Sequence, residues 1–441
     1  MKLLSAGTFV GIALAFAGGF LAYDYYRVPV PVEHAGLTAG EMAQNGEEPV
    51  PEEKTLEERI AEAYERSQNR KGVYMTSAVA NDRGTAGTRL RNSLLTLIRG
   101  TELNAVVIDV KEAPGLEVGK NMALLVAELK KEDIWTIARF TVMRDNSQAA
   151  AHPDWYLYRK DTHEVWRDNH KHAWFDPARP EVQNYTAETA KKIIDIGFDE
   201  IQFDYIRFPS DGDIQNSAYP FYNSKLHGPK YKVMAGFFKH LHDELKTYKP
   251  EIILSVDLFG YVASRGNDFG VGQRLEDLKD NFDYISFMVY ASHYYSGFYM
   301  EADAVRGLPK IYYPYRSATT SIVVSNHPYE VVHRSIIFAE DFLAGKFKKA
   351  TTTANTATSS VVSSVSDSPI SSSVSDSSSH RVRFRPFLQD FNLGADTKRG
   401  IYYDTEKVRA QIDAAEDAGA SGWILWNPSN VYHADALKKM P

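Results

Sequence analysis

The strongest constraint on the fold of this chain is an alternation of two kinds of segment that begins near Lys71 and continues to the C-terminus. Short apolar runs rich in β-branched and aromatic residues alternate with longer amphipathic stretches, which is typical of βα units and a parallel sheet. Eight strand-like runs lie at 72–77, 105–111, 135–142, 200–206, 253–259, 283–290, 383–389 and 422–427. Helix-like stretches lie at 88–99, 120–131, 181–196, 231–248, 328–344 and 405–418. This pattern predicts an α/β fold, a (β/α)8 TIM barrel over 71–441, with its active site at the C-terminal ends of the strands.

The segment before the barrel has the features of a targeting region. Residues 1–25 contain an uncharged run from Leu3 to Tyr23, long enough to cross a bilayer, although its small residues would also suit signal-peptide cleavage. Residues 26–70 are expected to form a Pro- and Glu-rich linker and a short helix, with Thr55 and Glu58 as a capping box. We therefore expect a signal anchor or signal peptide, and a protein that is exported and either membrane-anchored, facing outward, or secreted.

Residues 346–380 interrupt the barrel pattern with a segment made mostly of Ser and Thr. Such a composition cannot bury enough apolar surface to offset the entropy of ordering, so a disordered insertion is expected. A linker between two domains is the alternative, but the last two expected strands lie beyond this segment and the barrel cannot close without them.

Composition excludes several classes of function. The net charge is −7 and no Lys/Arg run resembles a phosphate-binding patch, so we expect no nucleic-acid partner. The chain has no cysteine, which excludes disulfides, a thiol nucleophile and cysteine-ligated zinc. No G-x-S-x-G motif supports an esterase. Four histidines fall in the long loop after the third expected strand, at 152, 163, 170 and 172, and of these only His170 and His172 are in a tight spacing. We predict neither a metal site nor a cofactor.

Polar residues recur near the C-terminal ends of consecutive expected strands. They are Asp109 and Lys111, then Arg139, then Gln202 and Asp204, then Ser255 and Asp257. Residues two apart share a face of a strand, so we expect Asp109 and Lys111 to point the same way. A buried carboxylate needs a partner, and Arg139, Arg207 or a substrate would supply one. A purely architectural ion network is the alternative interpretation.

Two carboxylates at a barrel mouth are the minimum requirement for hydrolysis of a glycosidic bond. We assign Asp204 as nucleophile or charge stabiliser, kept ionised by Arg207 and Gln202. Asp257 is the general acid, because its apolar sequence neighbours favour a raised carboxyl pKa. Glu112 is the rival acid.

Further residues are expected to contact the substrate from the strand ends and the loops that follow them. Besides Asp109, Lys111, Glu112, Arg139, Gln202 and Arg207, they are Trp174, Asp176, Tyr290, His293, Gln389, Asp390, Trp426 and Asn427.

Several motifs together resemble a known family. They are GFDEIQFDYIRFPSDG, VIDVKE, VWRDNHKHAWFDPARPEV, FMVYASHY, RPFLQDF and GWILWNPSN. They are similar to the putative glycoside hydrolase domain family of bacterial exported proteins. That resemblance implies a TIM barrel distantly related to α-amylase and chitinase barrels, and a glycosidase activity. The position of the chitinase-type catalytic glutamate is here Ile206, so the pattern is closer to barrels of the amylase or galactosidase type, where an Asp at the end of strand four is the nucleophile.

The sequence thus predicts a glycoside hydrolase that acts on an extracellular or cell-envelope polysaccharide or oligosaccharide and associates with a membrane through its N-terminal segment. A catalytically inactive, glycan-binding barrel at the cell envelope is the alternative. The oligomeric state stays open.

Overall fold

The computed structural model describes residues 54–82, 84–317, 322–347 and 381–440 of the 441-residue chain. The expected signal segment at 1–25, the linker up to residue 53 and the Ser-rich insertion beyond residue 347 lie outside the described residues. Among the residues that are described, no helix has the length and apolar character needed to cross a bilayer.

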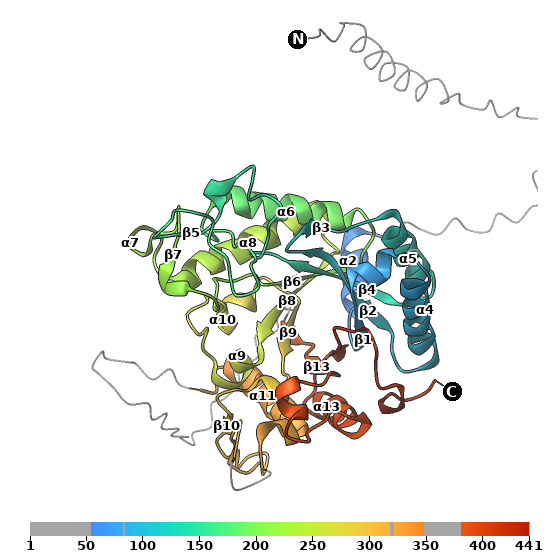
Figure 1. Cartoon of the computed structure of the whole chain (residues 1–441). Coiled ribbons are helices and arrows are strands. Elements are labelled where there is room, and N and C mark those ends of the chain that lie inside the picture. Colours follow the sequence, from blue (N-terminus) through green and yellow to red (C-terminus); the bar gives the residue numbers. More distant parts are fainter. Residues whose placement is uncertain (1–53, 83, 318–321, 348–380, 441) are drawn as a thin grey trace, which may run out of the picture. The chain divides into compact units, whose positions relative to one another are not determined.

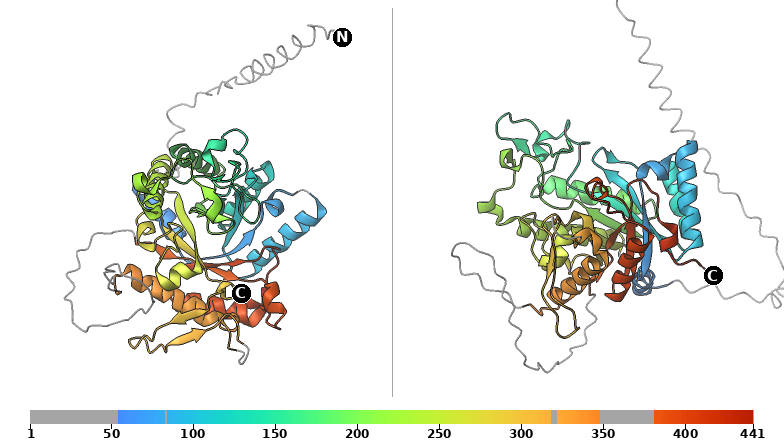
Figure 2. Two further views of the ribbon diagram at one scale, coloured as in Figure 1. Left: turned by 60° about the vertical axis from the view of Figure 1, so that its left-hand side comes forward. Right: turned by 60° about the horizontal axis from the view of Figure 1, so that its bottom comes forward.

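Eight parallel strands close into a barrel, with helices around it (Figures 1 and 2). The ring closes at β1, where Val73 lies opposite Val106 on one neighbouring strand and Leu425 on the other. The barrel strands in ring order are β1 (Arg70–Met75), β2 (Ala105–Glu112), β4 (Trp135–Thr141), β6 (Glu200–Asp204), β8 (Ile253–Phe259), β9 (Tyr284–Met288), the pair β12 (Arg383–Phe384) and β13 (Phe387–Gln389), and β14 (Gly422–Trp426). The predicted barrel is confirmed, and each expected strand is found within two residues of its predicted bounds.

Helices and short strands fill the connections between the barrel strands. The helices are α2 (Leu56–Arg66) before β1, α3 (Ser77–Asn81), α4 (Thr85–Gly100), α5 (Lys120–Lys131), α6 (Pro180–Ile194), α7 (Ser224–His227), α8 (Lys230–Tyr248), α9 (Gly260–Arg265), α10 (Leu275–Leu278), α11 (Pro328–Leu343), α12 (Gly394–Thr397) and α13 (Thr405–Asp417). Short strands in the loops are β3 (Gly115–Leu116), β5 (Tyr158–Arg159), β7 (Ser217–Ala218), β10 (Phe298–Met300) and β11 (Ile311–Tyr313). The six expected helices are all present, and α2 begins with the predicted Thr55–Glu58 capping box.

Local chemistry explains where two of the expected strands differ from the structure. The seventh strand is split because Pro386 lacks an N–H, so it cannot extend a parallel ladder. The fourth barrel strand, β6, ends at Asp204 instead of residue 206. There Tyr205 takes a left-handed conformation with φ 51°, which is uncommon for a residue other than glycine and cannot continue a strand.

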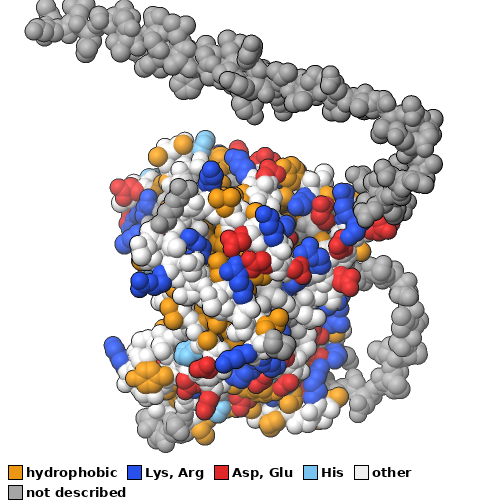
Figure 3. All heavy atoms as spheres, turned by 90° about the vertical axis from the view of Figure 1, so that its right-hand side faces the viewer, with side chains coloured by type: hydrophobic (Ala, Val, Ile, Leu, Met, Phe, Trp, Pro, Cys, Tyr) orange, Lys and Arg blue, Asp and Glu red, His pale blue; other side chains and the backbone are white. Residues whose placement is uncertain are grey.

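Two apolar layers lie on the two sides of the strands. The larger cluster packs outward-facing strand residues such as Val106 and Phe203 against the helices. The smaller cluster fills the barrel itself and includes Val107, Ile137 and Ile424. Burial of this apolar surface is the main driving force for folding. On the face drawn in Figure 3, charges of both signs are interspersed among apolar side chains.

The N-terminal end of the barrel is closed by a fully buried ion pair. Arg385 donates two hydrogen bonds of 2.7 and 2.9 Å to the carboxylate of Glu200, which also accepts one of 2.9 Å from the Trp135 indole. The second guanidinium nitrogen donates to the backbone carbonyl of Ser67, just after α2. Nε of Arg385 has no hydrogen-bond partner among the described residues, but both terminal nitrogens of the guanidinium are bonded. These bonds fix α2 against the end of the barrel opposite the strand C-termini.

A β-bulge in β2 corrects one expectation about the site. Asp109 lies opposite Arg139, but Lys111 lies opposite Phe140, so Val110 is an extra residue in the ladder. After an inserted residue, the following side chains point to the opposite faces of the sheet from those that regular alternation predicts. Asp109 and Lys111 therefore do not point the same way. The ammonium of Lys111 instead lies over the Phe140 ring and 2.8 Å from Asp145, and both partners of that ion pair are fully buried.

Candidate active site

Three carboxylates gather around one arginine at the C-terminal ends of four consecutive barrel strands. Arg139 on β4 lies 2.5 Å from Asp109 on β2, donates to Asp204 on β6, and has its Nε 3.8 Å from Asp257 on β8. We call these four residues the Arg139 cluster. Parallel strands end at the same edge of a barrel, which is why four distant sequence positions meet here.

The Arg139 cluster is almost entirely removed from solvent. The side chains of Asp109, Asp204 and Asp257 are 0%, 5% and 1% exposed, and that of Arg139 is 14% exposed. Burial alone would lower the pKa of Arg139, but the three surrounding carboxylates raise it well above its usual range. One cation faces three acidic groups, so the cluster favours keeping some of its carboxyl groups protonated.

Asp204 has the surroundings of a charged carboxylate. Its Oδ2 accepts a 3.1 Å hydrogen bond from Arg139 Nε and another from Nη2 of the same guanidinium. Its Oδ1 accepts a 2.6 Å hydrogen bond from the backbone N–H of Tyr205. The left-handed conformation of Tyr205 accompanies this contact, in which the residue next in sequence donates to the Asp204 side chain.

Asp257 has different surroundings. Its Oδ1 is buried and has no hydrogen-bond partner among the described residues. Burial raises the pKa of this carboxyl well above its usual range, and the nearby charge of Asp204 raises it further. Burial likewise raises the pKa of Asp109, whose carboxylate accepts a hydrogen bond from the Tyr74 hydroxyl. Thus Asp204 is held by donors, whereas Asp257 favours the protonated form.

Asp204 and Asp257 are close enough to act on one sugar ring. Arg139 Nε lies 3.1 Å from Oδ2 of Asp204 and 3.8 Å from Oδ2 of Asp257. Those two oxygens are therefore at most about 7 Å apart, a limit that includes the roughly 5 to 5.5 Å typical of retaining glycosidases.

Aromatic side chains form the other half of the barrel mouth. Tyr290, which follows β9, stacks on Trp426 of β14 with ring centroids 5.7 Å apart. Phe391, which follows β13, packs edge-on against both rings, at 5.4 and 5.0 Å. Trp426, Phe391 and His293 are partly exposed, whereas Tyr290 is buried. We call Tyr290, His293, Phe391 and Trp426 the aromatic wall. Acidic groups on strands two to five thus face aromatic groups on strands six to eight.

Residues 72–432 match the model of a family described as a putative glycosyl hydrolase domain. The chain belongs to this family. A comparison with curated proteins gave no match.

Among solved structures, the barrel is similar to the glycoside hydrolase domain of PgaB (BpsB) from Bordetella bronchiseptica. That domain is 12% identical with a TM-score of 0.51, and the alignment covers 84% of this chain and 99% of that one. A hypothetical protein from Ruminiclostridium thermocellum is 25% identical with a TM-score of 0.35, covering 42% of this chain and 96% of its own. The α-galactosidase TtGalA from Thermus thermophilus is 12% identical with a TM-score of 0.42, covering 82% and 60%. At 12% identity, the PgaB domain supports the barrel fold alone.

The expected partners of Asp204 need correction in this family member. Arg139 binds its carboxylate, not Arg207 or Gln202. The Gln202 amide donates instead to the Ser286 hydroxyl at 3.0 Å, one layer deeper in the barrel. Arg207 donates to the carbonyl of Phe208 and to the Ser210 hydroxyl, both at 3.0 Å. Because Asp204 ends β6, the chain turns away before Arg207 can reach the inner face.

Two expected substrate residues near β2 lie in different environments. Glu112 is partly exposed, and burial together with the Asp109 charge raises the pKa of its carboxyl. This is the direction that its role as rival acid requires. Lys111 is fully buried against Asp145 on the other face of the bulge, so its ammonium points away from the Arg139 cluster.

Trp174 and Asp176 are committed to holding loops in place. The Trp174 indole is fully buried and donates to Asp168 at 3.0 Å, so it presents no face to solvent. Asp176 accepts three backbone hydrogen bonds, two of them from Phe221 and Tyr222 at 2.8 Å. It therefore fastens the loop after β6 to the loop after β4.

The expected residues near β13 and β14 also connect loops. Gln389 is fully buried and joins the Ser292 hydroxyl to the Phe391 carbonyl. Asp390 accepts hydrogen bonds from the backbone N–H and the ring Nδ1 of His433, and Asn427 donates to the Asp390 carbonyl. These contacts fix the positions of Phe391 and Trp426 in the aromatic wall.

Sequence reasoning missed three residues at the mouth: Tyr74, Tyr205 and Phe391. Tyr74 is on β1, two residues after Gly72 and therefore on the same face of the strand. The alternation of faces along this strand would have indicated it. Phe391 is the last residue of the RPFLQDF motif and directly follows Gln389 and Asp390, two expected substrate residues. The conformation of Tyr205 leaves no signal in the local pattern.

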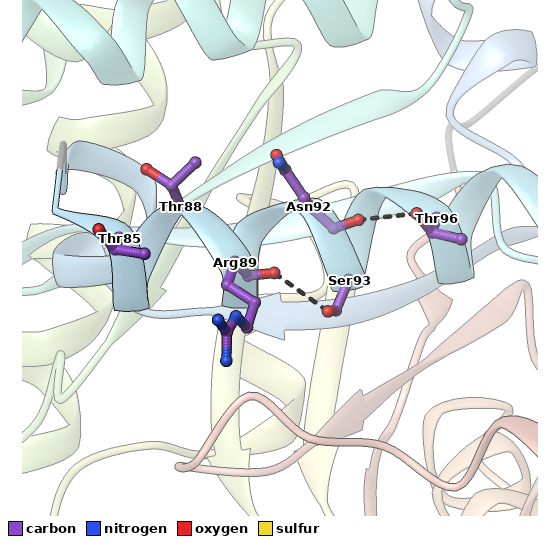
Figure 4. A pocket seen from close by; sticks show the side chains of 6 residues that line it. All are labelled: Thr85, Thr88, Arg89, Asn92, Ser93 and Thr96. Carbon is purple, nitrogen blue, oxygen red and sulfur yellow. Dashed lines mark hydrogen bonds between the residues drawn. The ribbon is translucent and has the colours of Figure 1, made fainter.

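A separate hollow of about 770 Å³ lies along the outside of α4 (Figure 4). Six side chains from one face of this single helix line it: Thr85, Thr88, Arg89, Asn92, Ser93 and Thr96. None of the six lining residues carries a carboxylate, and none belongs to a barrel strand. Among the described residues, no group of three or more His, Cys, Asp or Glu side chains is arranged to hold a metal ion.

Proposed function

We propose that the protein is a glycoside hydrolase that acts on an extracellular or cell-envelope polysaccharide. The observation that supports this most is that Asp204 and Asp257, which share Arg139 as a neighbour, have different surroundings. Asp204 is bound by N–H donors, whereas Asp257 has a raised pKa and an oxygen without a partner among the described residues. Glycosidases need one ionised and one protonated carboxyl group on either side of the scissile bond, and their environments set these states. The description of the family and the name of the PgaB glycoside hydrolase domain support the same reaction class.

In the first step, Asp257 donates its proton to the glycosidic oxygen while Asp204 attacks the anomeric carbon. The bond from that carbon to the leaving oxygen breaks, and a glycosyl ester forms on Asp204. In the second step, Asp257 takes a proton from water, whose oxygen displaces Asp204 from the sugar. Arg139 positions Asp204 and balances its charge after release. This sequence retains the anomeric configuration.

The aromatic wall supports a sugar as the ligand. Sugar rings present apolar C–H faces, and Trp426 and Phe391 offer partly exposed rings opposite the acids. A glycan bound between the two halves would have its polar edge toward Asp204 and its apolar face on the wall. Action outside the cell membrane is supported by the uncharged run from Leu3 to Tyr23.

The alternative is a barrel that binds glycans without cleaving them. The low exposure of Asp204 and Asp257 favours it, because each side chain is at most 5% exposed. Such a barrel would keep the aromatic wall and would tolerate loss of either carboxylate.

The deciding experiment incubates the purified full-length protein with bacterial envelope polysaccharides and labelled glycosides, and measures new reducing ends. Asp204→Asn and Asp257→Asn are expected to lower the rate roughly 10²- to 10⁴-fold. Asp243→Asn, an exposed position on α8, is the matched control and keeps the rate. Undiminished cleavage in both active-site variants would refute the assignment. Binding without cleavage by the wild type would establish the glycan-binding alternative.

A further inference from the structure

Arg207 is a buried cation beside the candidate active site, only three residues after Asp204. Arg207 is 6% exposed, and its guanidinium carbon lies over three aromatic rings. The distances to the ring centroids are 4.5 Å for Phe259, 5.1 Å for Tyr205 and 5.3 Å for Trp174. Phe259 ends β8, two residues after Asp257, so Arg207 lies between the ends of the two strands that carry the proposed catalytic acids.

No carboxylate of the described residues lies within ion-pair distance, 4.0 Å, of Arg207. Arg139 and Arg385, two buried arginines whose side chains lie inside the barrel, both have carboxylate partners. Asp204 and Asp211 act on Arg207 only through their charge at longer range. Burying a charge without a counterion is costly, so an unpaired guanidinium here requires a function or a missing partner.

The unused edge of the Arg207 guanidinium matches a carboxylate. Both of its hydrogen bonds leave from Nη1, to the Phe208 carbonyl and the Ser210 hydroxyl. Nε and Nη2 make no hydrogen bond with any described residue, and these two nitrogens form one edge of the guanidinium. Two parallel N–H groups along one edge fit the two oxygens of a carboxylate, a pairing that a neutral hydroxyl cannot reproduce.

Arg144 supports the same site from the loop after β4. Its guanidinium carbon lies 4.4 Å from the centroid of the Tyr205 ring, which Arg207 also contacts. Arg144 has its own counterion, since its Nε is 3.0 Å from Asp168. Of these two arginines, Arg207 is therefore the one whose charge has no counterion among the described residues. Arg144 adds a second positive charge beside it.

We propose that Arg207 binds a carboxylate of the substrate, so that the polysaccharide cleaved by this protein contains uronic acids. The inference rests on the proposed glycosidase function and adds the chemical class of its substrate. The carboxylate occupies the Nε and Nη2 edge of Arg207. The sugar that carries this group lies beside the one held between Asp204 and Asp257.

The test compares one envelope polysaccharide preparation in two forms. One form is native, and in the other carbodiimide and borohydride have reduced the uronic acid carboxyls to neutral hydroxymethyl groups. We expect the full-length wild-type protein to cleave the native form roughly ten- to a hundredfold faster, the range for a hydrogen-bonded charged pair. Equal rates on the two forms would overturn the proposal and leave the glycosidase function standing.

Two substitutions assign the preference to its residue. Arg207→Lys keeps the charge but loses the paired N–H groups, and it should lose most of the preference for the native form. Arg274→Gln is the matched control, because Arg274 also stacks on a tyrosine ring but is paired with Asp277. Retention of the full preference by Arg207→Lys would also overturn the proposal.

A binding arm separates this proposal from the failure of the glycosidase function. If the wild type cleaves neither form, affinity electrophoresis is run with both forms embedded in the gel. Retardation by the native form alone, lost in Arg207→Lys, supports the carboxylate site in a non-catalytic barrel. Equal retardation by both forms, or by neither, overturns it.

Discussion

Arg139 directs two nitrogens, Nε and Nη2, at a single oxygen of Asp204, and the other oxygen of that carboxylate is bound by the Tyr205 N–H. The side chain is therefore fixed at both ends before any substrate arrives. A preorganised carboxylate loses little entropy on reaching the transition state, which is an advantage for a nucleophile. The same fixation costs free energy unless each charge in the Arg139 cluster keeps its partner.

Replacing Arg139 should destabilise the fold strongly near neutral pH. Arg139→Met leaves three buried carboxylates without a cation, and we expect the free energy of unfolding to fall by about 3 to 5 kcal/mol. The loss should shrink at pH 4, where protonation removes the unpaired charge. Urea unfolding at both pH values measures it. Arg99→Gln is the control, since this arginine is 43% exposed and its pairs with Glu128 and Glu132 are worth about 0 to 1 kcal/mol. Similar losses for both variants would contradict the prediction.

The Asp257 carboxyl should make the stability of the wild type fall as the pH rises. In the unfolded chain this carboxyl ionises near pH 3.8, but in the folded protein its pKa lies well above that value. Between the two pKa values the folded state holds a proton that the unfolded state has released, so raising the pH lowers the stability of the wild type. Across this range, each pH unit lowers the free energy of unfolding by about 1.4 kcal/mol.

Asp257→Asn removes this pH-dependent loss. Thermal unfolding of the variant at pH 5 and pH 8 should show a smaller decrease with pH than that of the wild type. Asp243→Asn should follow the wild type, because Asp243 lies on the surface of α8. A decrease of the same size in wild type and Asp257→Asn would show that the folded carboxyl titrates normally.

Truncation of the aromatic wall should affect glycan binding more than the chemical step. Trp426→Ala removes a partly exposed ring that contacts Tyr290 and Phe391, and we expect KM to rise roughly tenfold with a smaller change in kcat. Tyr248→Ala, at the end of α8, removes an exposed aromatic ring away from the mouth and should leave KM unchanged. A Trp426→Ala effect confined to kcat would exclude the ring as a sugar platform.

Lys111 should prove to be a structural residue. Lys111→Met leaves Asp145 buried without its cation, and we expect a loss of about 3 to 5 kcal/mol in the free energy of unfolding. The companion variant Asp145→Asn in the same background should recover part of this loss, because it removes the unpaired charge. Urea unfolding of the single and double variants measures the coupling. A rise in KM without loss of stability would instead return Lys111 to the substrate site.

The Lys111 example shows where local sequence patterns stop being informative. Period-two alternation placed Asp109, Arg139, Asp204 and Asp257 at strand ends correctly, since inner and outer faces follow directly from strand geometry. The same counting failed two residues beyond Asp109, because nothing in VIDVKE distinguishes a regular strand from one with a bulge.

The sequence alone determined the barrel, because its strands and helices each carry a periodicity that survives without knowledge of the rest of the chain. It also placed acidic side chains at the mouth. Only the tertiary structure decided which arginine binds Asp204 and which is left without a carboxylate. Ion-pair partners come from strands far apart in the sequence, and their choice depends on backbone turns such as that at Tyr205. The backbone conformation of Tyr205, at the end of β6, thus decides that Arg139 is paired with Asp204 and that Arg207 has no carboxylate partner among the described residues.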